Sequence, residues 1–518
     1  MGNGFRDRLA AGHGKARRGR RPRGWRSGIV TGRPVLRRAL FALGLVIVVW
    51  FLYVLFAGGF VFAWNPVEPL TPEEAAAYRS ELRDGALEAN VALVEDNTFA
   101  GLARVDLLRR ANETLEISSH QITGGKAADL FFAEVLAAAE RGVSVRIILD
   151  GMFEGMRRLD DDLAQTVRAH PNIRIAFYEP LSILKPWTIQ NRFHDKMIVV
   201  DGAMLLTGGR NIGSRYFLYE IDDNSRFTQL RDRDVLVFSK EGPGDVTLEP
   251  PVAVSEAREY FETVWAHEWT HEQEGADRDD PVADSAAAHI SWAQDIVNEV
   301  TAESNELPVD WADRAIAADT VRFFTNPLER MNKTPTVFRK LSAFLDGAQE
   351  EAWIQSPFIV TNSNMETILG EFPRENQVLL TNSPATNPNW FAASGYLNQR
   401  TDFAGNSRAL YEYQGDGSIH AKAWLIDGRY SFIGAFNMDP RSAFLSTESM
   451  LFIESEAFGD KHRQAMERLA DRSLAMRSTN GDLVAVPREG VDMYEAGWVK
   501  RVALRIMSLF ARPLAFLL

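Results

Sequence analysis

The sequence predicts an α/β protein with two similar lobes, each a mixed β-sheet flanked by helices, behind an N-terminal transmembrane helix. The main observation is a pattern of six residues that begins at His194 and recurs with the same spacing at His420. A second is the alternation of strand-like and helix-like segments before each copy. The third is the uncharged, mostly apolar run over residues 39–64. A duplicated pattern in a chain of 518 residues indicates two lobes related by pseudo-twofold symmetry.

The N-terminal part is predicted to be a cytoplasmic tail, residues 1–38, followed by a membrane anchor, residues 39–64. The tail holds twelve Arg or Lys against one acid, Asp7. As a helix, the anchor would reach about 39 Å, enough to cross a hydrocarbon core of ~30 Å. A cleaved signal peptide usually has a shorter apolar region, and a buried core helix is the remaining alternative. The basic flank places the tail in the cytoplasm and the bulk of the chain across the membrane.

The charge of the chain is unevenly divided. The net charge is −13, and the part after residue 38 carries 45 bases against 69 acids. A globular part this acidic would be repelled by the phosphates of nucleic acid, which we therefore do not expect as a partner. The chain has no cysteine, which excludes disulfides, a thiol nucleophile and a thiolate metal site.

Composition divides the rest of the chain into four segments. We expect a first lobe over 86–270, an acidic linker over 271–315, a second lobe over 316–475 and a C-terminal tail over 476–518. The linker is expected to be irregular because acids and turn-forming residues dominate it.

The expected strands of the first lobe are 115–122, 143–150 and 172–178, with a helix over 127–140. In the second lobe a helix around 337–345 precedes strands over 352–360 and 377–383. This order of strand, helix and strand is typical of a parallel or mixed sheet.

The tail ends in a predicted amphipathic helix, Trp498–Leu518. Its basic sector and apolar face suit a membrane surface, although docking on the protein's own core is an open alternative. The residues are Arg501, Arg505 and Arg512 on the basic side and Trp498, Val502, Ile506, Leu509 and Phe510 on the apolar side.

The duplicated pattern predicts two β-hairpins. The copies read His194-x-Lys196-x4-Asp201-Gly202-x5-Gly208-x2-Asn211 and His420-x-Lys422-x4-Asp427-Gly428-x5-Gly434-x2-Asn437. On a strand, residues i and i+2 project from one face, so His and Lys point the same way. The Asp-Gly pair favours a tight turn, after which the returning strand ends at the Asn. Each hairpin would display His, Lys and Asn at one end.

Such a set suits phosphoryl transfer. Lysine is a compact cation for phosphate oxygens, and the asparagine amide also donates to them. A neutral imidazole can attack phosphorus, while a second, protonated imidazole donates to the leaving oxygen. Two hairpins brought together would supply all of these groups, so we expect no metal or other cofactor.

The two stretches resemble the HKD motifs of the phospholipase D superfamily. The flanking sequences GGRNIGSRYF (208–217) and GAFNMDPRS (434–442) are similar to those of bacterial cardiolipin synthases, particularly the C type. The resemblance covers roughly residues 95–475.

The resemblance implies a role for each residue of the motifs. His194 would be the nucleophile that forms a phosphatidyl-histidine, and His420 the general acid and later the base, although the reverse order stays open. Phosphate would be bound by Lys196, Lys422, Asn211 and Asn437. In the family a carboxylate orients each histidine; Glu448 fits this role, and in the first lobe Asp232 is preferred over Asp222.

Four further positions of the motifs carry weaker expectations. Asp201 and Asp427, although part of the pattern, are expected to cap turns rather than to react. Arg210 and Arg441 would either contact lipid phosphate or form surface salt bridges. The Ser usual after the first glycine is replaced by Gly209 and Ala435, so oxyanion stabilisation would depend on lysine, asparagine and backbone groups.

The resemblance also implies the reaction. The product would be cardiolipin, made from phosphatidylglycerol and a second phospholipid such as phosphatidylethanolamine, with release of the headgroup alcohol. The enzyme would sit in the bacterial inner membrane with its catalytic part on the periplasmic side. Hydrolysis of phospholipid to phosphatidic acid is the alternative, since the dryness of the pocket decides whether water reaches the adduct.

A competing motif is His267-Glu268-x2-His271. On a helix this spacing sets two imidazoles on one face for zinc, with Glu as base. Against zinc, the overlapping sequence EAREYFETVWAHEW reads as an amphipathic helix that closes the first lobe. A zinc peptidase, an incidental metal-binding surface, a nuclease of the same superfamily and a non-catalytic membrane scaffold remain the less favoured alternatives.

Overall fold

The computed structural model describes residues 32–85, 88–218, 221, 228–243, 249–275, 281–302, 306–370 and 374–518. Most of the basic tail, residues 1–31, and Asp222 lie outside the described residues. The chain divides into two compact units, Met1–Tyr53 and Val54–Leu518.

The N-terminal apolar run forms helix α1 (Gly32–Ala57). Over Leu36–Ala63 the chain is long and apolar enough to cross a membrane, and its most apolar 18-residue window has no buried residue. Such a segment is suited to membrane anchoring. The regular helix ends at Gly58-Gly59, after which a short 3₁₀ turn, η1 (Phe60–Ala63), belongs to the second unit.

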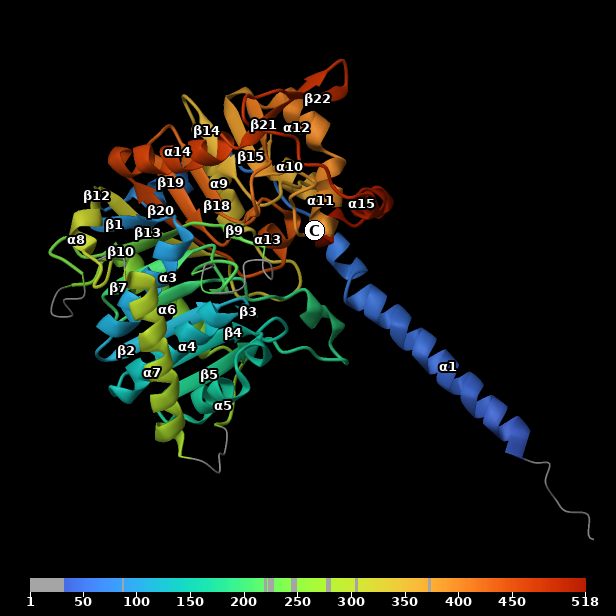
Figure 1. Cartoon of the computed structure of the whole chain (residues 1–518). Helices are drawn as coiled ribbons and strands as arrows, with labels where there is room; N and C mark the ends of the chain where they lie inside the picture. The colour runs from blue at the N-terminus through green and yellow to red at the C-terminus, as the bar shows by residue number, and fades with distance from the viewer. Residues whose placement is uncertain are drawn as a thin grey trace, which may run out of the picture. The chain divides into compact units, whose positions relative to one another are not determined.

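The first lobe is built on a mixed sheet, as predicted (Figure 1). Strands β2, β4 and β5 are parallel, and the strands from β6 to β1 are antiparallel to their neighbours. Across the sheet the order is β11 (Thr270–Glu272), β5 (Ile173–Tyr178), β4 (Ser144–Asp150), β2 (Thr114–Ser119), β6 (Met197–Val200), β7 (Met204–Gly208), β10 (Asp234–Phe238), β1 (Ala89–Val94) and β12 (Ile316–Ala318).

The second lobe repeats this topology. Eight successive strands, counted from β1 to β11 in the first lobe and from β13 to β21 in the second, correspond in order and in parallel or antiparallel sense. The order is β13 (Thr320–Thr325), β20 (Ser449–Glu454), β19 (Tyr430–Gly434), β18 (Lys422–Ile426), β14 (Ala352–Gln355), β15 (Gln377–Asn382), β16 (Ala409–Tyr413), β21 (Ser473–Thr479) and β22 (Asp482–Val486). The duplicated pattern therefore reflects a duplicated fold.

Helices cover the sheets, and the lobes share an apolar core. Inner-face residues of both sheets, such as Val199, Val235, Leu425 and Ile433, form one buried cluster. The main helices are α2 (Pro72–Arg83), α3 (Asn97–Arg110), α4 (Lys126–Glu140), α5 (Asp161–Ala169), α6 (Val252–Trp265), α7 (Val282–Thr301), α9 (Thr336–Asp346), α10 (Ser363–Leu369), α11 (Trp390–Leu397), α12 (Arg400–Asn406), α13 (Pro440–Phe444), α14 (Glu456–Ala470) and α15 (Trp498–Ala511).

The segment expected as an irregular linker is largely ordered. Helix α7 occupies much of it and packs on α4 and α5. Its buried residues Ala286, Ala293 and Val297 recur at helical spacing, a period that the acidic composition concealed. After it, α8 (Trp311–Arg314) buries Trp311 against Phe99 of the first lobe. The described part of this segment thus belongs to the first lobe.

Candidate active site

Both copies of the pattern form the predicted hairpins, β6–β7 and β18–β19. Asp201 and Gly202 have φ of 52° and 63°, and Asp427 and Gly428 have 50° and 65°. Two successive left-handed residues are the requirement of the tightest hairpin turn, and Asp-Gly tolerates them best. Each turn lies at the end of its hairpin opposite the histidine.

The two aspartates of the pattern hold these turns in place. Asp201 accepts hydrogen bonds of 2.8–3.2 Å from the backbone N–H groups of residues 112–114. Asp427 does the same with residues 349–351. Both carboxylates thereby cap the loop that leads into the neighbouring strand, and neither lies beside a catalytic histidine.

Each histidine pairs with a carboxylate from the other lobe. His194 Nδ1 lies 2.9 Å from Glu448 Oε2, and His420 Nδ1 lies 2.5 Å from Asp232 Oδ2. Both carboxylates are buried. The two acids named from the sequence thus reach the site, and each serves the histidine of the opposite lobe.

Backbone contacts fix this exchange between the lobes. Residues 230–231 form strand β9, which pairs in parallel with β17 (Ser418–Ile419), and His420 N donates to Arg231 O at 2.7 Å. On the other side, His194 N donates to Thr447 Oγ1 at 3.0 Å, and Thr447 N donates to Arg192 O at 2.9 Å. The residue before each acid is therefore bound at the opposite histidine.

The two pairs differ electrostatically. Burial alone would raise the pKa of Asp232, but the charges of His420, Lys422 and Arg210 hold it below its ordinary value. Burial raises the pKa of Glu448 well above its ordinary value, despite the opposing effect of Lys196. An ionised Asp232 accepts a hydrogen bond from Nδ1–H of His420. The proton stays on Nδ1, and Nε2 keeps its lone pair.

Burial favours the neutral form of both imidazoles in the empty site. Burial lowers the pKa of His194 well below its ordinary value, with Lys196 adding to the shift. The pKa of His420 falls to about 4 through burial and the charge of Lys422. A phosphodiester bound between them would favour the protonated form of either ring, because an opposite charge raises the pKa of a base.

The two lysines lie beside the histidines. Burial lowers the pKa of Lys196 to about 7, with Lys422 contributing, and lowers the pKa of Lys422 to about 8. Each Nζ contacts the backbone carbonyl of the histidine two residues earlier. The charge of Asp232 offsets part of both shifts, and a bound anionic phosphate would stabilise the charged form of the two lysines further.

The asparagines of the pattern have unused hydrogen-bonding capacity. Among the described residues, Oδ1 of Asn211 and Oδ1 of Asn437 are buried without a hydrogen-bond partner. Asn211 Nδ2 lies 3.0 Å from Tyr216 Oη. Amide O and N are told apart only by their network. With the two interchanged, the Tyr216 hydroxyl donates to Oδ1 and Nδ2 is free to donate to a phosphate oxygen.

Other aromatic groups beside the histidines were not identified from the sequence. The ring of His120, just after β2, lies 4.9 Å from that of His194, and His120 Nδ1 lies 2.7 Å from Phe193 O. The ring of Tyr216 lies 5.2 Å from that of His420. The sequence placed His120 inside the expected strand 115–122, whereas β2 ends at Ser119 and His120 begins the loop that follows, where site residues often lie.

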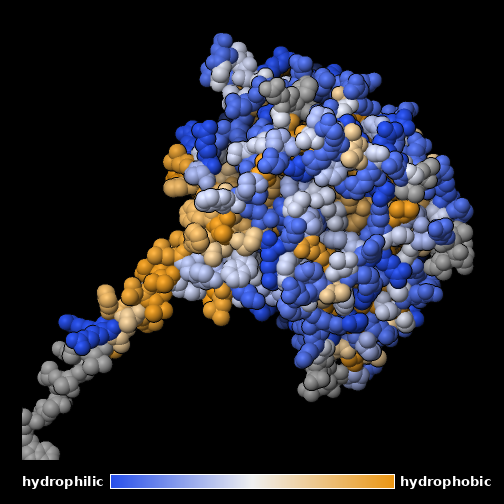
Figure 2. All heavy atoms as spheres, turned by 180° about the vertical axis from the view of Figure 1, so that it is seen from behind, coloured by the Kyte–Doolittle hydropathy of each residue, from blue (hydrophilic) through white to orange (hydrophobic). Residues whose placement is uncertain are grey.

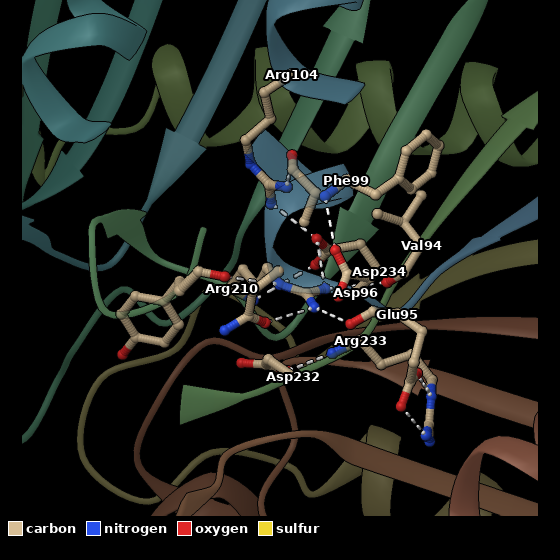
Figure 3. A network of polar contacts seen from close by, with 12 residues as sticks. Val94, Glu95, Asp96, Phe99, Arg104, Arg210, Asp232, Arg233 and Asp234 are labelled. Carbon is tan, nitrogen blue, oxygen red and sulfur yellow. Dashed lines mark hydrogen bonds and ion pairs between the residues drawn. The ribbon is translucent and has the colours of Figure 1, made fainter. Parts of the chain in front are cut away.

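The two arginines that flank the motifs make contacts within the protein. Arg210 is buried, so a surface salt bridge at this position is wrong, whereas Arg441 is half-buried. Arg210 binds Asp234 Oδ2 at 3.1 Å and the carbonyls of Val94, Glu95 and Tyr216 (Figure 3). Arg441 binds the carbonyl of Leu517 and the side chain of Gln190. Their guanidinium groups are used within the protein, because five donors in a fixed plane suit several carbonyls at once.

Gly209 has a steric reason for its departure from the usual Ser. A Cβ at this position would lie 2.2 Å from Asp232 Oδ1. In the second lobe Ala435 does carry a Cβ, and its N–H donates to Ser449 O at 2.8 Å. In the first lobe the carboxylate that serves His420 occupies the space of the missing side chain.

The zinc-binding interpretation of His267 and His271 is wrong. Helix α6 ends at Trp265, so His267 lies in a turn and His271 lies on strand β11, opposite Phe177. The two imidazoles therefore do not share a helix face. In the described part of the chain, no group of three or more His, Asp or Glu could hold a metal ion.

Comparison with known proteins places these features in a family. Residues 105–233 and 341–470, together half of the chain, match the family model described as cardiolipin synthase, PLD-like domain. The two matched segments contain the two hairpins, one in each lobe.

Similar sequences cover most of the chain. Cardiolipin synthase C of Escherichia coli K12 is 27% identical over 405 residues, which cover 70% of this chain and 81% of that protein. An uncharacterized protein of Helicobacter pylori strain 26695 is 24% identical over 454 residues, covering 78% of this chain and 84% of that protein. The crystal structure of phosphatidylserine synthase from Haemophilus influenzae superposes with a TM-score of 0.57 at 12% identity, covering 86% of this chain and 100% of that one, and shows the same fold.

Proposed function

The chain belongs to the cardiolipin synthase family with PLD-like domains, phospholipid-modifying enzymes of the phospholipase D type, and on this premise we propose that it makes cardiolipin by phosphatidyl transfer. Phosphatidylglycerol would be the acceptor, and phosphatidylglycerol or phosphatidylethanolamine the donor. The observation that carries the proposal is the pair of buried imidazoles, one from each lobe, each beside a lysine and within hydrogen-bond distance of a carboxylate from the other lobe.

In the first step Nε2 of His194 attacks the phosphorus of the donor lipid. The bond from phosphorus to the headgroup oxygen breaks, and that oxygen takes a proton from His420. The product of this step is a phosphatidyl-histidine and a free headgroup alcohol. Lys196, Lys422, Asn211 and Asn437 bind the non-bridging oxygens, where negative charge accumulates.

In the second step a hydroxyl of phosphatidylglycerol gives its proton to His420 and attacks the phosphorus. The bond to His194 breaks, and cardiolipin leaves. The reverse assignment of the histidines also has support, since the ionised Asp232 fixes the Nδ1 proton on His420. Quenching during turnover in a neutral denaturant, which spares the acid-labile N–P bond, followed by peptide mass analysis, would show whether His194 or His420 carries the phosphatidyl group.

Transfer to an alcohol is favoured over hydrolysis by burial of the reacting groups. The side chains of His194 and His420 are only 15% and 19% exposed, and a dry site protects an adduct from water. The test is incubation of purified protein with labelled phosphatidylglycerol, with and without phosphatidylethanolamine, followed by lipid separation. Cardiolipin supports the proposal; phosphatidic acid alone would make the protein a hydrolase.

The sidedness of the membrane is part of the proposal. The basic residues before the apolar helix support a cytoplasmic N-terminus, with the catalytic part on the periplasmic side of a bacterial inner membrane. Since the chain has no cysteine, a single cysteine placed in the catalytic part can be probed with a membrane-impermeant maleimide. Labelling in spheroplasts supports this orientation, and labelling only after lysis would reverse it.

A further inference from the structure

Three separate segments of the catalytic body expose large apolar side chains. The segment after β5 exposes Leu181 and Ile183, of which Ile183 is 74% exposed. Next to η1, Trp64 is 87% exposed. Helix α15 exposes Trp498, Val502, Ile506, Leu509 and Phe510. Exposed apolar groups that gather in one region mark an interaction surface.

These segments are bound to one another by two polar side chains, the buried Gln190 and the half-buried Arg441. Gln190 Nε2 donates to Gly58 O at 2.8 Å, at the start of η1. Arg441 donates to Gln190 Oε1 at 2.7 Å and to Leu517 O at 2.9 Å, just after α15. The segment after β5, the residues that follow the apolar helix and the C-terminus therefore meet at one place.

The region also adjoins the active site along the chain. Gln190 lies four residues before His194, and Arg441 lies four residues after Asn437. Between Gln190 and His194, Arg192 binds Thr188 O and Asp150 Oδ1. The exposed segment after β5 is thus connected to the nucleophile through a short, buried and hydrogen-bonded stretch.

We infer that Leu181, Ile183, Trp64 and the apolar face of α15 form a lipid-docking surface that inserts into an anionic bilayer and loads lipid into the site. Two features identify a bilayer as the occupant. The surface begins where the membrane-crossing apolar run ends, at Ala63. Its apolar side chains are interleaved with exposed Arg505 and Arg512, the pattern of helices that lie in an anionic interface. Figure 2 shows apolar side chains gathered at the edge of the body that carries α15.

This inference deepens the proposed function by naming how substrate reaches the site, but its test does not require activity. The chain has no cysteine, so single-cysteine variants of the full-length protein can carry an environment-sensitive fluorophore. Ile183→Cys and Leu509→Cys probe the docking surface, and Ala312→Cys on α8 is the matched control. In Figure 1, α8 lies at the opposite edge of the body from α15.

The labelled variants are reconstituted in phosphatidylglycerol vesicles and exposed to iodide or to spin-labelled lipid. The expected result is blue-shifted emission at positions 183 and 509, severalfold protection from iodide relative to position 312, and quenching by the lipid probe. Iodide access at position 183 equal to that at position 312 would overturn the inference. Protection from iodide without lipid quenching would also overturn it, because a protein partner would then cover the surface.

A second arm measures turnover. Leu181→Ser with Ile183→Ser is expected to raise the apparent KM for vesicle lipid severalfold and to leave turnover of detergent-dispersed lipid unchanged. The control is Val484→Ser, an exposed apolar residue on β22. An equal loss on both forms of the substrate would contradict a docking role. Loss of all activity in every variant, with lipid quenching intact, would count against the proposed reaction and not against the surface.

Discussion

Oδ2 of Asp232 lies 2.5 Å from Nδ1 of His420, a residue of the other lobe. The symmetric contact joins Glu448 to His194 at 2.9 Å. Each lobe thus supplies the imidazole of one half-site and the carboxylate of the other. Neither half-site is complete within a single lobe, so small relative movements of the lobes would misplace both histidines at once.

Asp232→Asn tests the first of these contacts. The amide has no charge to stabilise a protonated His420 and can offer N–H where the carboxylate accepted a hydrogen bond, which favours the wrong tautomer. We expect turnover to fall by about 10²–10⁴-fold with the fold retained. Initial rates of cardiolipin formation, with circular dichroism as the folding control, measure this. Turnover close to that of the unaltered protein would remove Asp232 from the mechanism.

Substitution of the histidines separates the proposed phosphatidyl transfer from zinc-dependent hydrolysis. His194→Ala and His420→Ala should each abolish transfer, because neither remaining imidazole can act as both nucleophile and acid. His267→Ala and His271→Ala should leave the rate unchanged, since both lie outside the site. Transfer should also survive EDTA. Inactivation by EDTA that added zinc reverses would contradict the mechanism.

The lysines predict a dependence on pH. In the empty site the pKa of Lys196 is about 7 and that of Lys422 about 8, so both are charged below these values and lose charge as the pH rises through them. We expect KM for the donor lipid to rise by roughly tenfold across this window. Lys196→Arg, whose guanidinium stays charged, should flatten part of the rise. A KM that falls with pH would contradict the role of the lysines.

Arg210→Met tests a structural role next to the site. The substitution leaves Asp234 paired only with Arg104, at 2.9 Å, and frees three backbone carbonyls. We expect the free energy of unfolding to fall by about 3–5 kcal/mol, as when one partner of a buried ion pair is removed. Denaturant unfolding measures it, with the exposed Arg314→Met as control. An unchanged stability together with a raised KM would restore a phosphate-binding role.

Gly209→Ser and Ala435→Ser form a matched pair. At position 209 the added Cβ would meet Asp232 Oδ1 at 2.2 Å, so the carboxylate must move away from His420. We expect turnover to fall by about 100-fold, the usual consequence of a misplacement near 1 Å. Ala435→Ser adds only a hydroxyl to an existing Cβ and should cost much less. Equal effects of the two substitutions would contradict the steric explanation.

The hairpins and the site residues could be predicted because their signal is local. His-x-Lys spacing and an Asp-Gly turn between apolar runs determine the direction of the side chains within a dozen residues. Which acid serves which histidine depends on how the two lobes pack, and no local pattern encodes that.

The wrong predictions also have physical reasons. The zinc-like spacing at His267 required the helix to continue, but the structure ends α6 at Trp265. Acidic composition concealed the apolar period of α7. A surface salt bridge was one of two expectations for Arg210, because the sequence does not show the buried carbonyls that bind it.

The exchange of acids between the lobes has a consequence for the newly made chain. While the protein is being synthesised, the first lobe emerges with His194 and Lys196 but without Glu448, which comes much later. His194 then has no carboxylate to orient it, and Lys196 and Asn211 are present without Lys422 and Asn437. Under the proposed mechanism, a nascent or truncated chain that holds only the first lobe is therefore inactive on the lipids around it. Both half-sites are completed together, when the second lobe folds against the first.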